Sequence, residues 1–299
     1  MQRFERGQMK DKISGLIIFL TIALIPSSYL TAKSFLWEVE VKGVKSYILG
    51  SIHMLKKSSF PLKEELENGF KSCDFLVVEA DISAGNMGEI FKVTMEKAVY
   101  ADGSKLSEHI SEDTMKLAKA RLDKLKMSID YFEKFKPWFL AMSITSMELM
   151  KLGFDANMGV DKYFINKTGE KKILELEGIP FQIGIFDNFS DKENDMFLRS
   201  SLSEADSLGE NVDSMVKAWE EGNVDGLTKM VTKNRKKEID LAGIFKIIID
   251  DRNVTMTGKI EKWLNGGGKY FIIVGSAHLV GEKGIINLLS GKGFKLKQL

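Results

Sequence analysis

Two of the three histidines in the chain occur in the same short pattern of residues. Residues 47–54 read YILGSIHM and residues 272–279 read IIVGSAHL, so each copy is an apolar run followed by Gly-Ser-x-His and one apolar residue. The motif residues are Gly50, Ser51 and His53 in the first copy and Gly275, Ser276 and His278 in the second. Because neutral imidazole is a common metal ligand and an acid or base near neutral pH, the pair predicts metal or acid–base chemistry. The alternative is two structural histidines that support tight turns.

The apolar runs before the two motifs are typical of buried strands, and these strands must place the histidines. Glycine at the tip of a strand permits a sharp turn or a close approach of the backbone. Ligands of α/β proteins bind at the carboxyl ends of the strands, where polar residues converge. We therefore expect His53 and His278 to face each other across a crevice at that edge of a sheet.

Glu79 is the third candidate, because it ends the apolar run FLVVE at residues 75–79. An acid at this position is either a helix cap or a site residue, and beside two imidazoles it would be a metal ligand or a general base. Such a set suits zinc, manganese, cobalt or iron, and residue types alone do not select among them. Asp81 follows two residues later and would either orient a histidine by accepting its other ring N–H or cap the following loop. His109 lacks the pattern and is expected at the surface.

The overall composition excludes several classes of protein. The 299 residues are enough for a sizeable core, and 44% hydrophobic with 28% charged residues argues against disorder. The 43 basic and 42 acidic residues leave a net charge of +1, which lacks the basic excess that nucleic-acid binding needs. The single cysteine, Cys73, excludes an intrachain disulfide and any Cys-rich metal site.

Residues 1–32 have the layout of a targeting segment. A basic head precedes a short apolar run at residues 13–25 and a polar exit, which predicts a secretory signal peptide. The apolar run is shorter than the ~20 residues of a membrane-spanning helix, and an uncleaved single-pass anchor is the alternative. Either version predicts export of residues 33–299, to the periplasm or the outside of the cell. Contact with a membrane is expected only through this segment, if it is retained.

The remaining chain predicts an α/β fold with a central mixed sheet built from both chain ends and a largely helical middle. Strands are expected at residues 35–41, 46–49, 75–79, 172–177, 270–274 and 294–296. Helices are expected at residues 62–72, 86–100, 111–126, 136–151 and 285–289. The helical insertion is expected over about 86–264, with breaks at Gly222 and Gly243.

From about Phe35 to Leu299 the chain resembles the TraB/GumN family, which includes TIKI-type proteases and pheromone-shutdown proteins. The residues that carry the resemblance are Leu36-Trp37-Glu38-Val39, Leu49-Gly50-Ser51-Ile52-His53-Met54, Val77-Val78-Glu79-Ala80-Asp81, Lys136-Pro137-Trp138, Gly159-Val160-Asp161, Leu176-Glu177-Gly178 with Gln182, Asp251-Arg252-Asn253, and Val274-Gly275-Ser276-Ala277-His278-Leu279-Val280-Gly281. One departure is the sequence Leu55-Lys56-Lys57 after the first motif, where the family often has Leu-Pro.

The resemblance implies a fold similar to erythromycin esterases and haem-binding ChaN-like proteins, and a metal-dependent hydrolase activity. TIKI-type members are described as peptidases supported by manganese or cobalt. By motif position His53, Glu79 and His278 would bind the metal and carry the chemistry, and Arg252 would bind substrate or stabilise a developing negative charge. The residues that would contact substrate or support the site are Gly50, Ser51, Asp81, Asp161, Gly275 and Ser276. Asp161, Glu177 and Gln182 match the family and would either face the cleft or brace helices.

Three functional hypotheses follow. The first is an exported metal-dependent hydrolase, a peptidase that uses a divalent metal, with manganese or cobalt favoured over zinc or iron. The second is a binding protein that captures a peptide or a small ligand such as haem without cleaving it. The third is an exported structural protein whose histidines support turns. In the first two, the partner is a peptide or small molecule and not a nucleic acid.

Overall fold

A computed structural model describes residues 33–237 and 241–299 of the chain. The predicted signal peptide or anchor at residues 1–32 lies outside these described residues. Within the described ranges, no helix is both long enough and apolar enough to cross a membrane.

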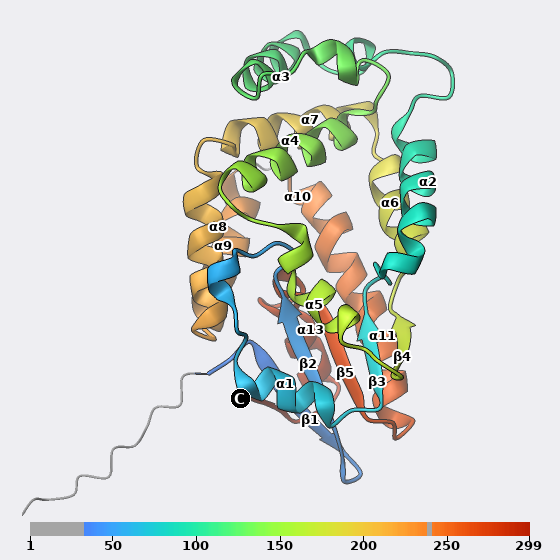
Figure 1. Ribbon diagram of the computed structural model, residues 1–299, viewed down its shortest axis with the longest axis vertical. Coiled ribbons are helices and arrows are strands. Elements are labelled where there is room, and N and C mark those ends of the chain that lie inside the picture. Colours follow the sequence, from blue (N-terminus) through green and yellow to red (C-terminus); the bar gives the residue numbers. More distant parts are fainter. Residues whose placement is uncertain (1–32, 238–240) are drawn as a thin grey trace, which may run out of the picture. The chain divides into compact units, whose positions relative to one another are not determined.

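The centre of the fold is a mixed sheet of six strands (Figure 1). The strands are β1 (Leu36–Val41), β2 (Val44–Ser51), β3 (Phe75–Val78), β4 (Lys172–Glu175), β5 (Tyr270–Gly275) and β6 (Leu296–Gln298). Their order is β4-β3-β5-β2-β1-β6. The strands β4, β3, β5 and β2 run parallel, whereas β1 is antiparallel to both β2 and β6. The predicted α/β class and mixed sheet are confirmed, with five strands from the two chain ends and β4 from the middle.

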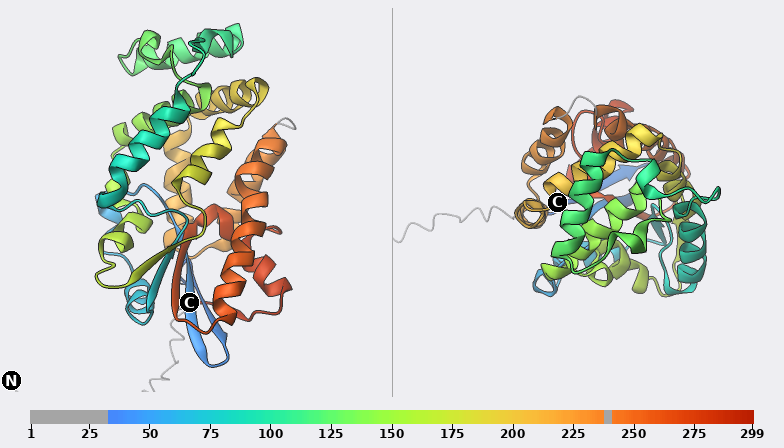
Figure 2. Two further views of the ribbon diagram at one scale, coloured as in Figure 1. Left: turned by 90° about the vertical axis from the view of Figure 1, so that its right-hand side faces the viewer. Right: turned by 90° about the horizontal axis from the view of Figure 1, so that it is seen from above.

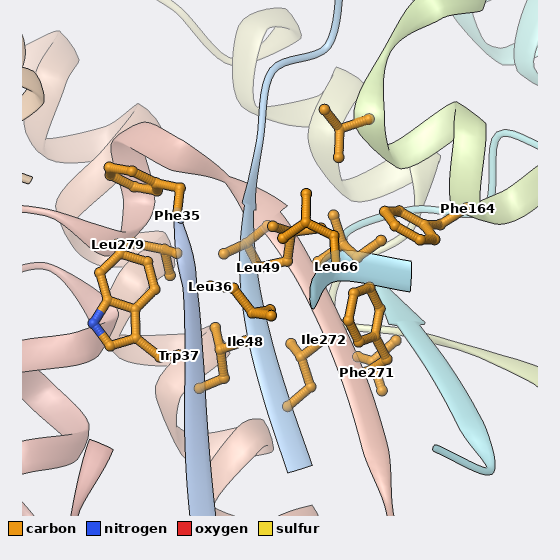
Figure 3. Close-up of a cluster of buried hydrophobic side chains, with 14 of the residues drawn as sticks. Phe35, Leu36, Trp37, Ile48, Leu49, Leu66, Phe164, Phe271, Ile272 and Leu279 are labelled. Carbon is orange, nitrogen blue, oxygen red and sulfur yellow. The ribbon is translucent and has the colours of Figure 1, made fainter. Parts of the chain in front are cut away.

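The parallel strands are buried because helices cover both faces of the sheet. All six residues of β5 are buried. On one face Phe271 packs against Phe70 of α1 (Glu64–Lys71) and Phe164 of α5 (Val160–Asn166), with ring centroids 5.5 and 5.0 Å away. Figure 3 shows the larger buried cluster to which Phe271 and Phe164 belong, with Leu36 and Leu49 on the same face of the sheet and Ile48 on the other.

The other face is covered by α11 (Asp251–Asn265) and α13 (Ile285–Gly291), and the sheet lies between the two helical layers (Figure 2). Trp263 of α11 stacks on Tyr270 of β5 at 6.1 Å. Between β5 and α13 the chain forms the short helix α12 (Ser276–Leu279). The second motif therefore sits where a strand passes directly into a helix.

The helical middle of the chain lies mostly beyond the ends at which β2, β3 and β5 finish (Figure 1). Its helices are α2 (Met87–Ala98), α3 (Glu112–Lys124), α4 (Pro137–Lys151), α6 (Ile179–Asp187), α7 (Asp191–Glu204), α8 (Leu208–Glu220), α9 (Val224–Lys237) and α10 (Leu241–Phe245). A π-helix (Lys246–Asp250) joins α10 to α11. Short 3-10 helices occupy Lys57–Ser59, Ala84–Asn86, Leu106–Glu108, Ile129–Phe132 and Ala156–Met158.

Of the two predicted helix breaks, one is confirmed and one is wrong. Gly222 separates α8 from α9 and has a φ of +63°, which glycine adopts without strain. Gly243 instead lies inside α10. Glycine within a helix costs only about 1 kcal/mol relative to alanine, and burial of its neighbours Leu241 and Ile244 offsets that cost.

Candidate functional site

The parallel pairing of β2 with β5 brings the two Gly-Ser-x-His motifs together. Gly50 pairs with Val274, and Ser51 pairs with Gly275. The two copies are therefore neighbours, displaced from each other by one residue. Both lie at the carboxyl end of the parallel strands, which is the edge where the sequence predicts a crevice.

After the strands the two copies differ in local structure. Beyond β2 the backbone stays outside regular structure, and Ile52 accepts a hydrogen bond from the backbone N–H of Val160 at 3.0 Å. The side chain of His53 in this loop is 62% exposed. Beyond β5 the chain enters α12 at once, and the side chain of His278 is only 6% exposed. His53 thus lies at the solvent-exposed mouth of the site, and His278 lies at its buried base.

The three candidate side chains converge on the space that the missing side chain of Gly275 leaves open. A Cβ atom at Gly275 would lie 3.2 Å from Nε2 of His53, 3.4 Å from Oε1 of Glu79 and 3.5 Å from Cδ2 of His278. Nε2 of His278 and Oε1 of Glu79 are 4.0 Å apart. The predicted proximity of His53, Glu79 and His278 is thus present in the structure.

Glu79 follows β3, and both of its carboxylate oxygens accept hydrogen bonds. Oε1 accepts the backbone N–H of Gly275 at 2.6 Å. Oε2 accepts from Nε2 of Gln182 at 2.9 Å and from Nη2 of Arg252 at 2.6 Å. Burial raises the pKa of this carboxyl, but His278, His53, Arg252 and the N–H of Gly275 outweigh it and lower the pKa to about 2. Glu79 is therefore ionised at neutral pH.

Arg252 is held between two carboxylates. Its Nε donates to Oε1 of Glu177 at 2.9 Å, and its Nη2 donates to Oε2 of Glu177 at 2.7 Å as well as to Glu79. Nη1 donates to the backbone oxygen of Ile248 at 3.0 Å. The side chain of Glu177 is only 1% exposed, and Gln182 bonds it at 3.0 Å. Every guanidinium nitrogen thus has a protein acceptor, and the expected contact of Arg252 with substrate stays a prediction.

Asp161 of α5 orients His53. Its Oδ2 lies 3.1 Å from Nδ1 of the imidazole, and a carboxylate at this distance accepts the Nδ1 proton. Desolvation in the cleft lowers the pKa of His53, but the charges of Asp161 and Glu79 raise it more, and the pKa is above its usual value. Gly159 makes this arrangement possible, because a Cβ atom there would lie 2.3 Å from the backbone oxygen of His53.

His278 has a neutral partner in place of a carboxylate. Its Nδ1 lies 2.6 Å from Oδ1 of Asn253 on α11. Burial lowers the pKa of His278, and Arg252 lowers it further, so that despite the opposing effect of Glu79 it falls to about 4. The ring is therefore neutral at pH 7.

A cleft of about 320 Å³ opens above these groups. Its lining residues are Ser51, His53, Met54, Val78, Glu79, Ala80, Ile82, Ala156, Asp161, Gln182 and Ile273. Two buried oxygen atoms of lining residues, Oγ of Ser51 and Oδ1 of Asp161, have no hydrogen-bonding partner among the described residues. Unpaired buried polar atoms are rare in folded proteins, and these two belong to a polar centre within partly apolar walls.

Six of the predicted site residues do not line the cleft: Gly50, Asp81, Arg252, Gly275, Ser276 and His278. A Cβ atom at Gly50 would lie 2.5 Å from the ring of Phe35 and 3.1 Å from Cα of Ser276, so Gly50 permits close packing of the two motifs. Ser276 is buried at the start of α12. Oδ1 of Asp81 accepts the backbone N–H of Ser83 at 2.9 Å, so Asp81 caps the following turn, the alternative that its position left open.

His109 is far less exposed than the sequence suggests. Its side chain is 20% exposed, stacks on Tyr100 with a centroid distance of 4.2 Å and bonds Asp191 and Ser104 at 3.0 and 2.9 Å. These neighbours come from the loop before α3 and from the start of α7. His109 therefore braces helices and takes no part in the cleft.

Gln182, Glu177 and Asn253 complete the site. The sequence places all three in family motifs, yet it shows no contact of their side chains. Gln182 lines the cleft from α6, Glu177 lies beneath Arg252, and Asn253 holds His278. In the sequence, only its position next to Arg252 pointed to Asn253 as a site residue. Neighbouring residues on a helix point in different directions, so this position does not show that both side chains reach one site.

The residues present suit a divalent cation in their chemical type. Two imidazoles and one carboxylate are ligands of transition metals, and the cradle at Gly275 has room where a Cβ atom would otherwise stand. Nε2 of His278 and Oε1 of Glu79 are 4.0 Å apart, somewhat wider than the ~3.3 Å between neighbouring tetrahedral ligands of Zn²⁺. Within the ranges that the structure describes, no three His, Cys, Asp or Glu side chains stand close enough to hold an ion jointly as placed.

Comparison with known proteins places the chain in a family. The model of the TraB/PrgY/gumN family matches residues 35–298. The uncharacterized protein YbaP of Shigella flexneri is 25% identical over 251 residues, which cover 82% of this chain and 87% of that protein. The uncharacterized protein YbaP of Escherichia coli K12 is 25% identical over 250 residues, which cover 81% and 87%. No solved structure matches the chain.

Proposed function

The chain belongs to the TraB/PrgY/gumN family, and we propose that it is an exported metal-dependent hydrolase that cleaves peptides. The observation that supports this proposal most is the convergence of His53, Glu79 and His278 on the cradle at Gly275. These three side chains would hold the divalent metal, manganese or cobalt in preference to zinc or iron. When bound, such an ion polarises a carbonyl group and lowers the pKa of water, which is the chemistry of metallohydrolases.

The surrounding residues hold the ligands in place. Asp161 accepts the Nδ1 proton of His53, which leaves Nε2 of that ring for the cleft. Gln182 and Arg252 fix Oε2 of Glu79, and the backbone of Gly275 fixes Oε1. This preorganisation avoids the cost of ordering the carboxylate when a ligand binds.

The walls of the cleft suit a peptide. Met54, Ile82 and Ile273 supply apolar surface around the polar centre, a composition common to sites that bind organic ligands. The hydroxyl of Ser51 is the unpaired donor at the cleft, and in this proposal it donates to a carbonyl oxygen of the substrate. Export rests on the layout of residues 1–32.

A cleavage assay tests the proposal. The full chain, loaded with manganese or cobalt, is incubated with a peptide library, and products are identified by mass spectrometry. Glu79→Gln is expected to lower turnover by at least about 100-fold, because it removes the central carboxylate. Glu175→Gln on the neighbouring strand β4 is the matched control and should leave turnover unchanged. Equal turnover of Glu79→Gln and the unaltered chain would remove Glu79 from the mechanism.

One observation favours a second function, the capture of a ligand without cleavage. Both carboxylate oxygens of Glu79 already accept hydrogen bonds from Gly275, Gln182 and Arg252. Fewer of its lone pairs are therefore available to bind a metal. A binding protein with this cleft would retain a peptide or small molecule in a 1:1 ratio. Mass spectrometry would then show bound ligand and no product.

A further inference from the structure

The contacts of Asn253 decide which nitrogen of His278 carries the proton. The amide Nδ2 of Asn253 donates to the backbone oxygen of Lys283 at 2.8 Å, which fixes the orientation of the amide. Its Oδ1 therefore faces Nδ1 of His278, at 2.6 Å. An amide oxygen only accepts hydrogen bonds, so Nδ1 of a neutral ring must be the donor. Asn253 and His278 are 1% and 5% exposed, so water does not replace this contact.

We propose that Asn253 is a positioning residue that holds His278 in the tautomer whose Nε2 lone pair is on the side of Glu79. In this orientation Nε2 is 4.0 Å from Oε1 of Glu79. The inference deepens the proposed function and rests on it in one respect, because a divalent cation binds the lone pair and not the N–H of an imidazole.

The choice of an amide is what distinguishes the two histidines. The partner of His53 is the carboxylate of Asp161, which accepts the Nδ1 proton and carries a negative charge. The amide of Asn253 accepts the Nδ1 proton without adding a charge. The buried His278 thus has a neutral partner, whereas the exposed His53 has a charged one.

Asn253 also connects two parts of the backbone. It lies near the start of α11, and Lys283 lies in the loop between α12 and α13. The hydrogen bond between them ties the loop that follows the second motif to the helix that carries Arg252. The orientation of the amide is therefore set by the backbone and not by the imidazole that it holds.

The tautomer is directly measurable. The chain has only three histidines, so ¹⁵N-histidine labelling of the full chain gives three ring systems in long-range ¹H–¹⁵N correlation spectra. At neutral pH without added metal, the His278 ring, assigned by its loss in His278→Gln, is expected to show a protonated Nδ1 and an unprotonated Nε2. A proton on Nε2 in the unaltered chain would overturn the inference, whether or not any variant folds.

Substitutions then test the link to metal binding. Asn253→Leu removes the hydrogen-bond acceptor of His278, so the tautomer with the proton on Nε2 should become populated. Manganese affinity is expected to fall 10- to 100-fold, as it does when metal-binding histidines lose their hydrogen-bonding partners. Asn253→Asp keeps an acceptor and should restore the Nδ1 proton and manganese binding. Asn287→Leu, which loses an exposed amide bond to Gly281, is the matched control and should change neither.

The outcomes separate the inference from the proposed function. If Asn253→Leu keeps the Nδ1 proton of His278 fully populated, Asn253 does not select the tautomer and the inference is wrong. If the unaltered chain has the expected tautomer and Asn253→Leu loses it, the inference holds. Should the unaltered chain then bind no manganese, cobalt, zinc or iron, the metal-dependent function alone would fail.

Discussion

Gly275 donates its backbone N–H to Oε1 of Glu79 at 2.6 Å, so the second histidine motif and the acid after β3 are joined through the main chain. The same residue leaves room for the two imidazoles, because it has no side chain. Gly275 thus contributes a backbone hydrogen bond to Glu79, and its lack of a side chain leaves room for the rings of His53 and His278.

Gly275→Ala should therefore damage the site and spare the fold. The φ of Gly275 is −52°, which alanine adopts readily, and the exposed ring of His53 can move away from the added methyl group. We expect a change of less than about 1 kcal/mol in the free energy of unfolding and at least a 10-fold loss of metal affinity. Urea denaturation and manganese titration measure the two. Gly258→Ala, at an open position of α11, is the control and should retain full affinity.

Arg252→Leu is expected to destabilise the fold by about 3–5 kcal/mol, because it leaves Glu79 and Glu177 as two buried carboxylates without their shared cation. Lys292→Leu removes an exposed partner of Glu261 and should cost less than about 1 kcal/mol. Denaturant unfolding compares the two variants. Similar losses in both would show that the Arg252 cluster contributes no more than a surface ion pair.

Ser51→Ala and Ser46→Ala test the unpaired hydroxyl of the cleft. Both serines are buried, at 2% and 1% exposure. Ser46 accepts the backbone N–H of Tyr270 at 3.0 Å and donates to Gly268 at 3.3 Å, so Ser46→Ala should cost about 1–3 kcal/mol. Ser51→Ala breaks no bond to a described residue and should leave the free energy of unfolding unchanged or raise it. A large loss in Ser51→Ala would reveal a structural partner for that hydroxyl.

The acid stability of the helical region should depend on Asp187. This carboxylate at the end of α6 bonds Lys136 at 2.5 Å and Lys97 at 3.0 Å. Burial raises the pKa of Asp187, but the two lysines outweigh burial and lower it. A carboxyl with a lowered pKa in the folded state stabilises the fold above its unfolded pKa of about 3.9, and this contribution is lost as the pH falls through the folded pKa.

Asp187→Asn should therefore be less stable than the unaltered chain at pH 7, and the difference should shrink below about pH 4. Urea unfolding at a series of pH values gives this difference directly. A difference that stays constant down to pH 3 would mean that the charge of Asp187 contributes nothing to stability.

Much of the fold follows from local patterns in the sequence. The apolar runs predict all six strands, and α3 lies within the helix expected at residues 111–126, with the hydroxyl of Ser111 accepting the backbone N–H of Thr114 at its start. The break expected at Gly243 fails because one glycine in a short helix is outweighed by the burial of its neighbours. Local preference decides elements where no tertiary contact opposes it.

The site was predictable only in part. The repeated motif and the acid after FLVVE identify the residues that converge, but pairing register and partners depend on tertiary contacts. The one-residue displacement of the motifs follows from the pairing of Ser51 with Gly275. The role of Asp161 depends on a contact with His53 across 108 residues of the chain. The role of Asn253 depends on a contact with His278 across 25 residues.

Metal content tests directly whether His53 and His278 form one metal site. The full chain is purified without chelator, reconstituted with manganese or cobalt, and analysed by plasma mass spectrometry together with His53→Ala, His278→Ala and the control His109→Ala. We expect close to one metal ion per chain in the unaltered protein and in His109→Ala, and loss of that ion in both other variants. No metal in the unaltered protein, or equal metal in all four proteins, would contradict a metal site formed by the paired motifs.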